Sequence, residues 1–127
     1  MSVGEILRIE RTADRVTATL DRPAVRNAID QAMIDALHAL CAEVEADPRI
    51  LILTGAGGIF ASGADIAQLR DRRAQDARSG INTTAFRRIR QLPMPVIAAV
   101  DGYALGGGAE LAYAADLRIG TPSTKIG

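Results

Sequence analysis

Residues 102–112 read Gly-Tyr-Ala-Leu-Gly-Gly-Gly-Ala-Glu-Leu-Ala, with a glycine triplet at the head of a segment rich in Ala and Leu. Because glycine has no Cβ, a turn at Gly106–Gly108 can bring backbone N–H groups close to a ligand. A helix that starts there leaves its first N–H groups unpaired and points the positive end of its dipole at the same place. Glu110, on the first turn of that helix, would lie beside this anion site. We therefore expect negative charge to develop here during a reaction.

The spacing of apolar residues predicts strands that alternate with helices. Residues Ile6–Glu10 and Val16–Leu20 are typical of a hairpin. Ile50–Leu53 and Val96–Val100 are continuous apolar runs, as expected of strands buried on both faces, and Leu117–Ile119 is interpreted in the same way. A helix is expected behind the N-cap Asp30 and before Pro48, since Met33, Leu37, Leu40 and Val44 recur at helical spacing. Phe86, Ile89 and Leu92 mark another helix. This order predicts an α/β fold.

Composition narrows the class of protein. The chain has 127 residues, of which 48% are hydrophobic, and its formal net charge is zero. It therefore fits a single domain, and neither nucleic acid nor a membrane surface is expected as a partner. The start has no basic region followed by an apolar run, and Asp101 and Glu110 interrupt the longest apolar stretches, so we expect neither a secretory signal nor a membrane span. The single Cys41 suits a reducing cytoplasm.

Several segments together resemble the crotonase superfamily, the enoyl-CoA hydratase/isomerase family, in their order and spacing. They are Leu20-Asp-Arg-Pro, Arg26-Asn-Ala-Ile, Phe60-Ala-Ser-Gly-Ala-Asp-Ile, the run from Pro95-Val-Ile-Ala-Ala-Val to the glycine triplet, Ala115-Asp-Leu-Arg-Ile and Thr124-Lys-Ile-Gly. The resemblance implies a spiral of ββα units. Family members are roughly twice this length, so residues 1–127 would be the N-terminal part of a crotonase-like core, incomplete at the C-terminus. The helical C-terminal region that closes the pocket and builds trimers would be absent.

The resemblance also implies roles for individual residues. The backbone N–H groups of Ala64 and Gly107 would stabilise the oxyanion formed from a thioester carbonyl. Glu110 matches the first of two glutamates that activate water in hydratases of the family. The second follows just after the position that matches Gly127. An isolated carboxylate amid Ala and Leu is expected to have a raised pKa, because desolvation disfavours its charged form.

Contacts to coenzyme A are implied for two segments, Ala24 to Arg26 and Asp65, Ile66 and Ala67. Many relatives carry a Lys where this chain has Ala24 and Ala67. The thioester would be the substrate, and no separate cofactor is expected. Residues 70–90 hold seven Arg and two Asp, which indicates either a solvated face or an attraction for the phosphates of coenzyme A. Between Leu69 and Gly80 the sequence has no apolar periodicity and predicts a mobile surface segment.

The resemblance implies an enoyl-CoA hydratase that forms a trimer or hexamer at full length. An isomerase or dehydratase of the same family is an alternative, as is a non-catalytic half domain that binds acyl-CoA or self-associates. Gly55-Ala-Gly57 follows a strand, but a dinucleotide fingerprint would need a third glycine where Phe60 stands. His38 is expected at the surface, and one His with one Cys predicts no zinc site.

Overall fold

The computed structural model describes residues 5–63 and 82–127. Ala64, Asp65, Ile66, Ala67 and the charged segment 69–80 lie outside the described residues. The elements follow in the order β1 (Leu7–Arg11), β2 (Arg15–Leu20), a 3-10 turn η1 (Pro23–Val25), α1 (Gln31–Ala46), β3 (Ile50–Gly55), a helix over residues 82–90, β4 (Val96–Val100), β5 (Tyr103–Ala104), α3 (Gly107–Ala114), β6 (Leu117–Gly120) and β7 (Lys125–Ile126).

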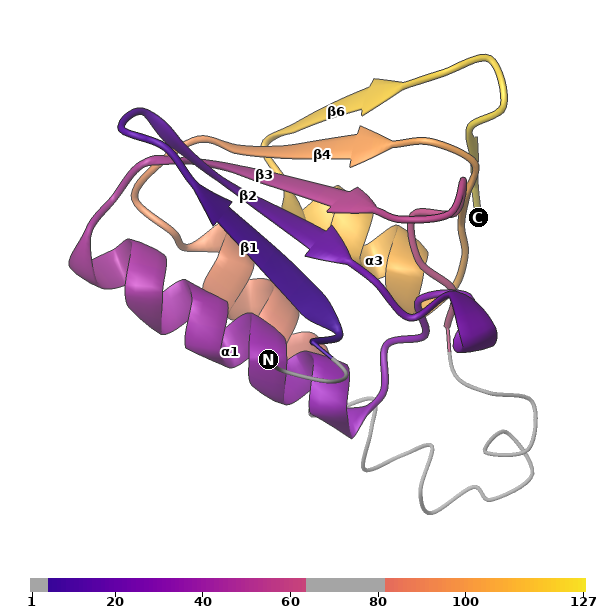
Figure 1. Ribbon diagram of the computed structural model, residues 1–127, viewed down its shortest axis with the longest axis horizontal. Helices are drawn as coiled ribbons and strands as arrows, with labels where there is room; N and C mark the ends of the chain where they lie inside the picture. The colour runs from indigo at the N-terminus through magenta and orange to yellow at the C-terminus, as the bar shows by residue number, and fades with distance from the viewer. Residues whose placement is uncertain (1–4, 64–81) are drawn as a thin grey trace.

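The main sheet has the strand order β1-β2-β3-β4-β6. Strands β1 and β2 form the predicted antiparallel hairpin, and β2, β3, β4 and β6 are parallel neighbours. The described parts of the connections between the parallel strands contain α1, the helix over residues 82–90 and α3, and Figure 1 shows these helices on one side of the sheet. The α/β class is confirmed, and the register aligns the buried side chains: Leu51 lies opposite Val16 on one neighbouring strand and Val96 on the other.

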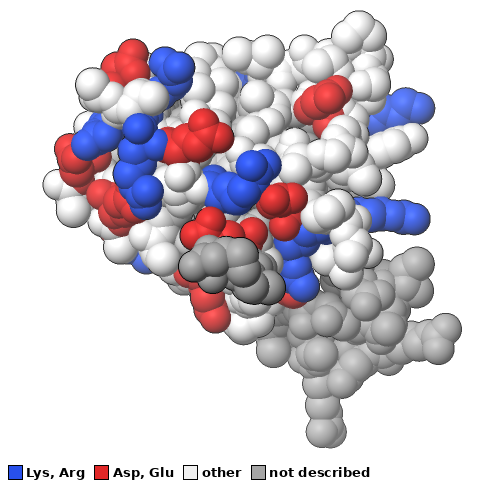
Figure 2. Space-filling view, in the orientation of Figure 1, with Lys and Arg blue, Asp and Glu red and all other residues white. Residues whose placement is uncertain are grey.

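Helix α1 forms as its sequence predicts. The Asp30 carboxylate accepts a hydrogen bond from the Met33 N–H at 2.9 Å, which satisfies one of the unpaired donors of the first turn. Its buried face includes Met33, Leu37, Leu40 and Val44. Arg11 on β1 donates two hydrogen bonds to Glu43 on α1, at 2.5 and 2.6 Å, and so ties the helix to the hairpin. Figure 2 shows basic and acidic side chains mixed over this part of the surface.

The expectation that the apolar strands are buried on both faces is wrong for the described residues. Along β3 and β4 only alternate side chains are buried, among them Leu51, Leu53 and Val96, because the helices cover a single face of the sheet. All four residues of β6 are exposed. An apolar run therefore predicted the strand correctly but not which of its faces would be covered.

A second, two-stranded sheet was not predicted. Tyr103 and Ala104 of β5 pair in parallel with Lys125 and Ile126 of β7. Two residues are too few to show an alternating pattern, so no periodicity could reveal these strands. Their pairing returns the last residues of the chain to the segment that leads into the glycine triplet.

His38 and Cys41 lie on α1 in different surroundings. His38 is half-buried and its Nδ1 lies 3.1 Å from Nη1 of Arg88, a residue of the helix over 82–90 that also donates to Glu45. Cys41 is buried, and desolvation raises the pKa of its thiol to about 11. No helix within residues 5–63 and 82–127 is long and apolar enough to cross a membrane.

We expect the 127-residue chain to self-associate through β6. This strand is at the edge of the described sheet, so one row of its backbone groups has no neighbouring strand, and Leu117 and Ile119 are each 59% exposed. A second copy could pair with this edge and cover both side chains. Because the net charge is zero, two copies do not repel each other through their total charge. Ile119→Lys should weaken the association at least severalfold in sedimentation velocity. Ala39→Lys, on the exposed side of α1, is the matched control.

A chain that stays monomeric across the micromolar range would contradict this expectation. So would equal association of the Ile119→Lys and Ala39→Lys variants, because a contact that ignores β6 would lie elsewhere.

Candidate active site

The glycine triplet forms the turn into α3, and each glycine has a different task. Gly106 is the N-cap with φ 54° and ψ −120°, a conformation that side chains with a Cβ rarely adopt. Gly107 is the first residue of α3, as predicted, and its N–H donates to no acceptor among the described residues. The neighbouring N–H groups are used, since Gly106 donates to the Gly127 carbonyl at 3.0 Å and Gly108 to Leu105 at 2.8 Å. Gly107 therefore presents an N–H without an acceptor among the described residues at the start of a helix.

Gly108 permits a close approach between the helix and the segment that carries Phe60-Ala-Ser-Gly. A Cβ on Gly108 would lie 2.1 Å from the Ala61 carbonyl oxygen, so no larger residue fits. The Ala61 carbonyl accepts from the Leu105 N–H at 3.1 Å, and the Phe60 N–H donates to Tyr103 at 2.9 Å. These bonds hold the segment alongside β5 and bring Gly63 to the turn. A Cβ on Gly63 would lie 3.3 Å from the Gly107 nitrogen.

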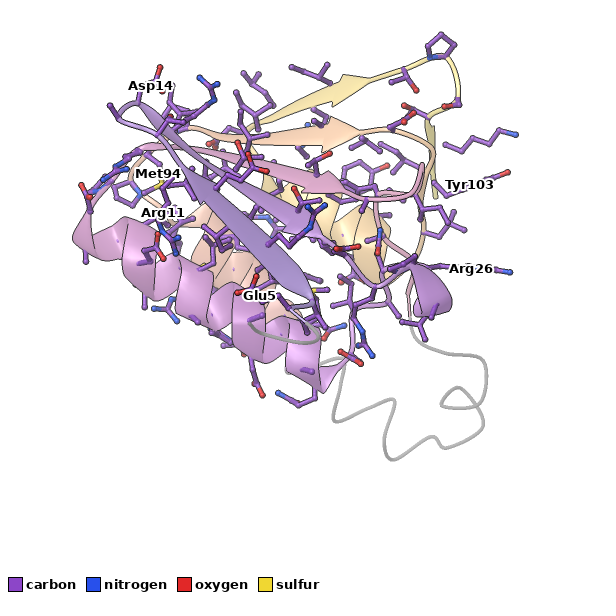
Figure 3. All side chains as sticks on the ribbon, viewed as in Figure 1. Glu5, Arg11, Asp14, Arg26, Met94 and Tyr103 are labelled. Atoms are coloured by element: carbon purple, nitrogen blue, oxygen red, sulfur yellow. The ribbon has the colours of Figure 1, made fainter. Side chains whose placement is uncertain are left out.

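The same segment is tied on its other side to the loop after β2. The Ser62 N–H donates to the Arg26 carbonyl at 3.1 Å, and the Ile29 N–H donates to the Ser62 carbonyl at 3.3 Å. The structure thus brings Ala24–Arg26, one predicted coenzyme A contact, next to the residues that lead into the other. Ala24 and Arg26 are exposed. Figure 3 shows the side chains of Arg26 and Tyr103 extending away from the body of the molecule on the same side.

Asn27 joins these loops, and its role was missed from the sequence. Its side chain is fully buried, and it is the buried polar residue of the described core. The Oδ1 atom accepts from the Arg22 N–H at 2.7 Å, and the Nδ2 group donates to the carbonyls of Ala56 and Ile59 at 3.0 and 2.9 Å. Both Arg26 and Asn27 have positive φ, at 55° and 56°. The asparagine amide therefore holds the loop after β2 against the loop after β3.

Arg22 and Asp30 close the same loop by an ion pair at its two ends. Burial alone would raise the pKa of the Asp30 carboxyl, but hydrogen bonds from the Arg22 side chain and the Met33 N–H outweigh it and hold the pKa below its usual value. The carboxylate thus stays charged at neutral pH, and it caps α1 while it holds Arg22. The exposed residues Ala24 and Arg26 are therefore presented by a loop that is fixed at both ends.

Glu110 lies one turn into α3, and its N–H donates to the Gly106 carbonyl at 3.0 Å. The side chain is exposed, although the neighbouring Ala109 and Leu111 are buried. The expectation that apolar neighbours desolvate this carboxylate is therefore wrong for the described residues, because these neighbours in sequence point to the core side of the helix. The acid and the free Gly107 N–H are nevertheless within one helical turn of each other.

The structure places some of the predicted site residues and leaves others undescribed. Gly107, Glu110, Ala24 and Arg26 are placed around one end of the sheet, while the four residues 64–67 lie outside the description. Gly127 lies against the glycine turn, where its N–H donates to the Ala104 carbonyl at 3.1 Å. Among residues 5–63 and 82–127, no three His, Cys, Asp or Glu side chains gather at a possible metal site.

The fold is α/β, and an N–H without an acceptor among the described residues starts α3 one turn before a carboxylate. The family model described as enoyl-CoA hydratase/isomerase matches residues 11–127. The chain belongs to the enoyl-CoA hydratase/isomerase family, and the crotonase resemblance is confirmed.

Individual relatives agree with this assignment. The chain is 37% identical over 124 residues to the short-chain-enoyl-CoA hydratase of Clostridium acetobutylicum, covering 94% of this chain and 48% of that protein. It is 36% identical over 128 residues to the crotonyl-CoA hydratase of Syntrophomonas wolfei, covering 97% and 49%. The crystal structure of an enoyl-CoA hydratase from Bacillus anthracis matches with a TM-score of 0.90 and 32% identity, over 97% of this chain and 50% of that one. The chain therefore spans about half the length of the relatives it matches.

Replacement of Asn27 by Asp should destabilise the fold strongly. The change keeps an acceptor for the Arg22 N–H but places carboxylate oxygens against the carbonyls of Ala56 and Ile59, which lose their donor. Each buried group left unpaired costs about 1–3 kcal/mol, so we expect a loss of about 3 kcal/mol or more in the free energy of unfolding. Urea denaturation followed by circular dichroism measures this loss.

The exposed Gln91→Glu change, which also converts an amide to a carboxylate, is the control and should alter stability by less than about 0.5 kcal/mol. If Asn27→Asp were no more destabilising than this control, the buried amide would not hold the two loops together.

Proposed function

We propose that these residues supply the oxyanion site and one acid of an enoyl-CoA hydratase, which adds water to a 2-enoyl-CoA thioester. The observation that carries the proposal is the free Gly107 N–H at the start of α3, with Glu110 one turn further along the same helix. Membership of the hydratase/isomerase family and the hydratase relatives support it.

The Gly107 N–H would bind the thioester carbonyl oxygen as the carbonyl becomes an enolate. A donor held by the backbone does not have to reorient when the charge forms, and one such donor typically contributes about a hundredfold to a thousandfold in rate. The second donor of the proposal is the Ala64 N–H. Its neighbour Gly63 lies against the Gly107 turn, which supports the pairing of these two segments.

Glu110 would take a proton from water as the oxygen of that water forms its bond to C3 of the enoyl group. The electron pair of the C2=C3 bond then moves toward C2 and the thioester oxygen, and a proton returned to C2 completes the syn addition. In hydratases of the family a second glutamate shares this water, and it follows just after the position of Gly127. The contact of Gly127 with Gly106 supports such a location, because the residue after Gly127 would lie near the turn.

Coenzyme A would bind along the loop after β2. Ala24 to Arg26 would contact it, with the exposed Arg26 guanidinium available to its phosphates. Asp65, Ile66 and Ala67 complete this contact in the proposal. The fixed ends of the loop, at Asn27 and at the Arg22–Asp30 ion pair, would keep its backbone groups in place without a ligand.

Two alternative functions are compatible with the same residues. An isomerase or dehydratase of the same family would use the same oxyanion site, and a non-catalytic chain would bind acyl-CoA without turnover. The presence of an acid at position 110 favours hydration, because family members that only isomerise or hydrolyse often lack one there. We further propose a cytoplasmic homo-oligomer, a trimer or hexamer, for the protein at its full natural length.

Replacing Glu110 by Gln tests the hydratase assignment in the protein at its full natural length. The amide keeps the shape of the side chain but accepts no proton from water, so turnover of crotonyl-CoA should fall by about 10²–10⁴. KM should change much less, because binding depends on the backbone donors and the coenzyme A contacts. Loss of absorbance of the enoyl thioester follows the reaction directly.

Asp116→Asn removes another carboxylate from the end of α3 and is the control for a general effect of charge. Its Oδ2 accepts from the Val96 N–H at 2.8 Å, a bond that an amide oxygen can also accept. Near-normal turnover in Glu110→Gln would show that the proton is taken by another group. If the unmodified protein binds butyryl-CoA but does not hydrate crotonyl-CoA, the non-catalytic alternative is favoured.

A further inference from the structure

The segments that follow β4 and β6 differ in length, although the strands at both of their ends are in register. Val100 of β4 pairs with Gly120 of β6. Further along both segments, Tyr103 of β5 pairs with Lys125 of β7. Two residues separate these pairs on the first segment, whereas residues 121–124 separate them on the second. The longer segment must therefore fold back on itself for β7 to meet β5 in the observed register, and Figure 1 shows the chain bending sharply after β6.

Asp101, between β4 and β5, holds the longer segment in its folded form. Its Oδ1 atom accepts hydrogen bonds from the hydroxyl groups of Thr121 and Ser123, at 2.9 and 3.0 Å. The Thr124 hydroxyl donates to the Val100 carbonyl at 2.5 Å, and the Thr124 N–H donates to the Thr121 carbonyl at 3.0 Å. One carboxylate oxygen thus ties two residues of the longer segment to the shorter one.

The register that this turn sets decides which residue reaches the glycine triplet. The first residue of β7, Lys125, donates its N–H to the Gly102 carbonyl at 3.0 Å. Two residues further on, the Gly127 carbonyl accepts from the Gly106 N–H at 3.0 Å. A slip of β7 by one residue would turn its side chains to the opposite face and move this carbonyl away from Gly106. The place of Gly127 therefore depends on the fold of the segment after β6.

We propose that Asp101 is a positioning residue for the hydration reaction, which sets the place of Gly127 and of the second acid that follows it. The inference rests on the proposed function. Asp101 is exposed, and it acts on the reaction only through the segment that it folds. The two proposed acids reach the water from different parts of the chain, Glu110 from α3 and the second acid from beyond β7. Because a misplacement of about 1 Å can cost about a hundredfold in rate, fixing one acid relative to the other matters for turnover.

Substitutions of Asp101 in the protein at its full natural length test this role. Asp101→Ala removes the acceptor of both hydroxyl groups, so kcat for crotonyl-CoA should fall about tenfold to a hundredfold while KM changes less than about threefold. Asp101→Asn keeps an oxygen that accepts from hydroxyl groups, and its kcat should stay within about twofold of the unmodified protein. Asp14→Ala is the matched control, because the Asp14 carboxylate accepts from the Thr12 hydroxyl at 2.7 Å in another exposed turn. The control should leave kcat unchanged.

Hydrogen exchange at the Gly106 amide reports the register of β7 without any substrate. This N–H donates to the Gly127 carbonyl, so it should exchange severalfold faster in Asp101→Ala than in the unmodified protein or in Asp14→Ala. Asp101→Asn should exchange at the rate of the unmodified protein. Glycine-selective ¹⁵N labelling allows the exchange rate of this amide to be followed by NMR.

The outcomes separate this inference from the hydratase proposal. Equal kcat in Asp101→Ala and Asp14→Ala, or unchanged exchange at Gly106, would overturn the inference and leave the assignment of Glu110 intact. An equal loss of kcat in Asp101→Asn and Asp101→Ala would also overturn it, because the charge and not the folded segment would then be responsible. Failure of the unmodified protein to hydrate crotonyl-CoA would overturn both.

Discussion

The amide of Asn27 is the constraint on which the arrangement of the site depends. One fully buried side chain pairs with backbone groups of the two loops that follow β2 and β3. A buried amide group that loses a hydrogen-bond partner destabilises the fold, because it has left water and has no partner in the protein. The two loops are therefore held at one separation. The Ser62 bonds to Arg26 and Ile29 follow from that separation. They in turn place Gly63 against the glycine triplet, where the free N–H of Gly107 begins α3.

The site is consequently built from backbone groups more than from side chains. Gly106 sets the turn, Gly108 allows the contact with Ala61, and Gly107 keeps an unpaired donor between them. A donor fixed in this way needs no rearrangement when negative charge appears on a bound oxygen. The side chain that we assign to chemistry, Glu110, lies one turn further along the same helix. Such a division would let the acyl group or the reaction vary while the proposed oxyanion site stays the same.

Much of this arrangement could be predicted from the sequence, where the pattern is local. The glycine triplet predicted the start of α3 at Gly107, and Asp30 predicted the N-cap of α1, because both depend on neighbouring residues. The predictions that failed concern which side chains are buried, and burial depends on tertiary packing. Glu110 has buried neighbours in sequence yet is exposed, and the apolar run Leu117–Ile119 is a strand with neither face buried. The partners of Asn27 lie about thirty residues away, so no local pattern could identify them.

The most direct test of the account observes the Gly107 amide itself. Glycine-selective ¹⁵N labelling of the protein, followed by titration with acetoacetyl-CoA, reports each glycine N–H in a two-dimensional NMR spectrum. We predict a downfield shift of the Gly107 proton that exceeds the shifts of Gly106 and Gly108, whose N–H groups already donate within the chain. A Gly107 resonance that stays in place while the thioester binds would contradict the claim that this N–H receives the thioester oxygen.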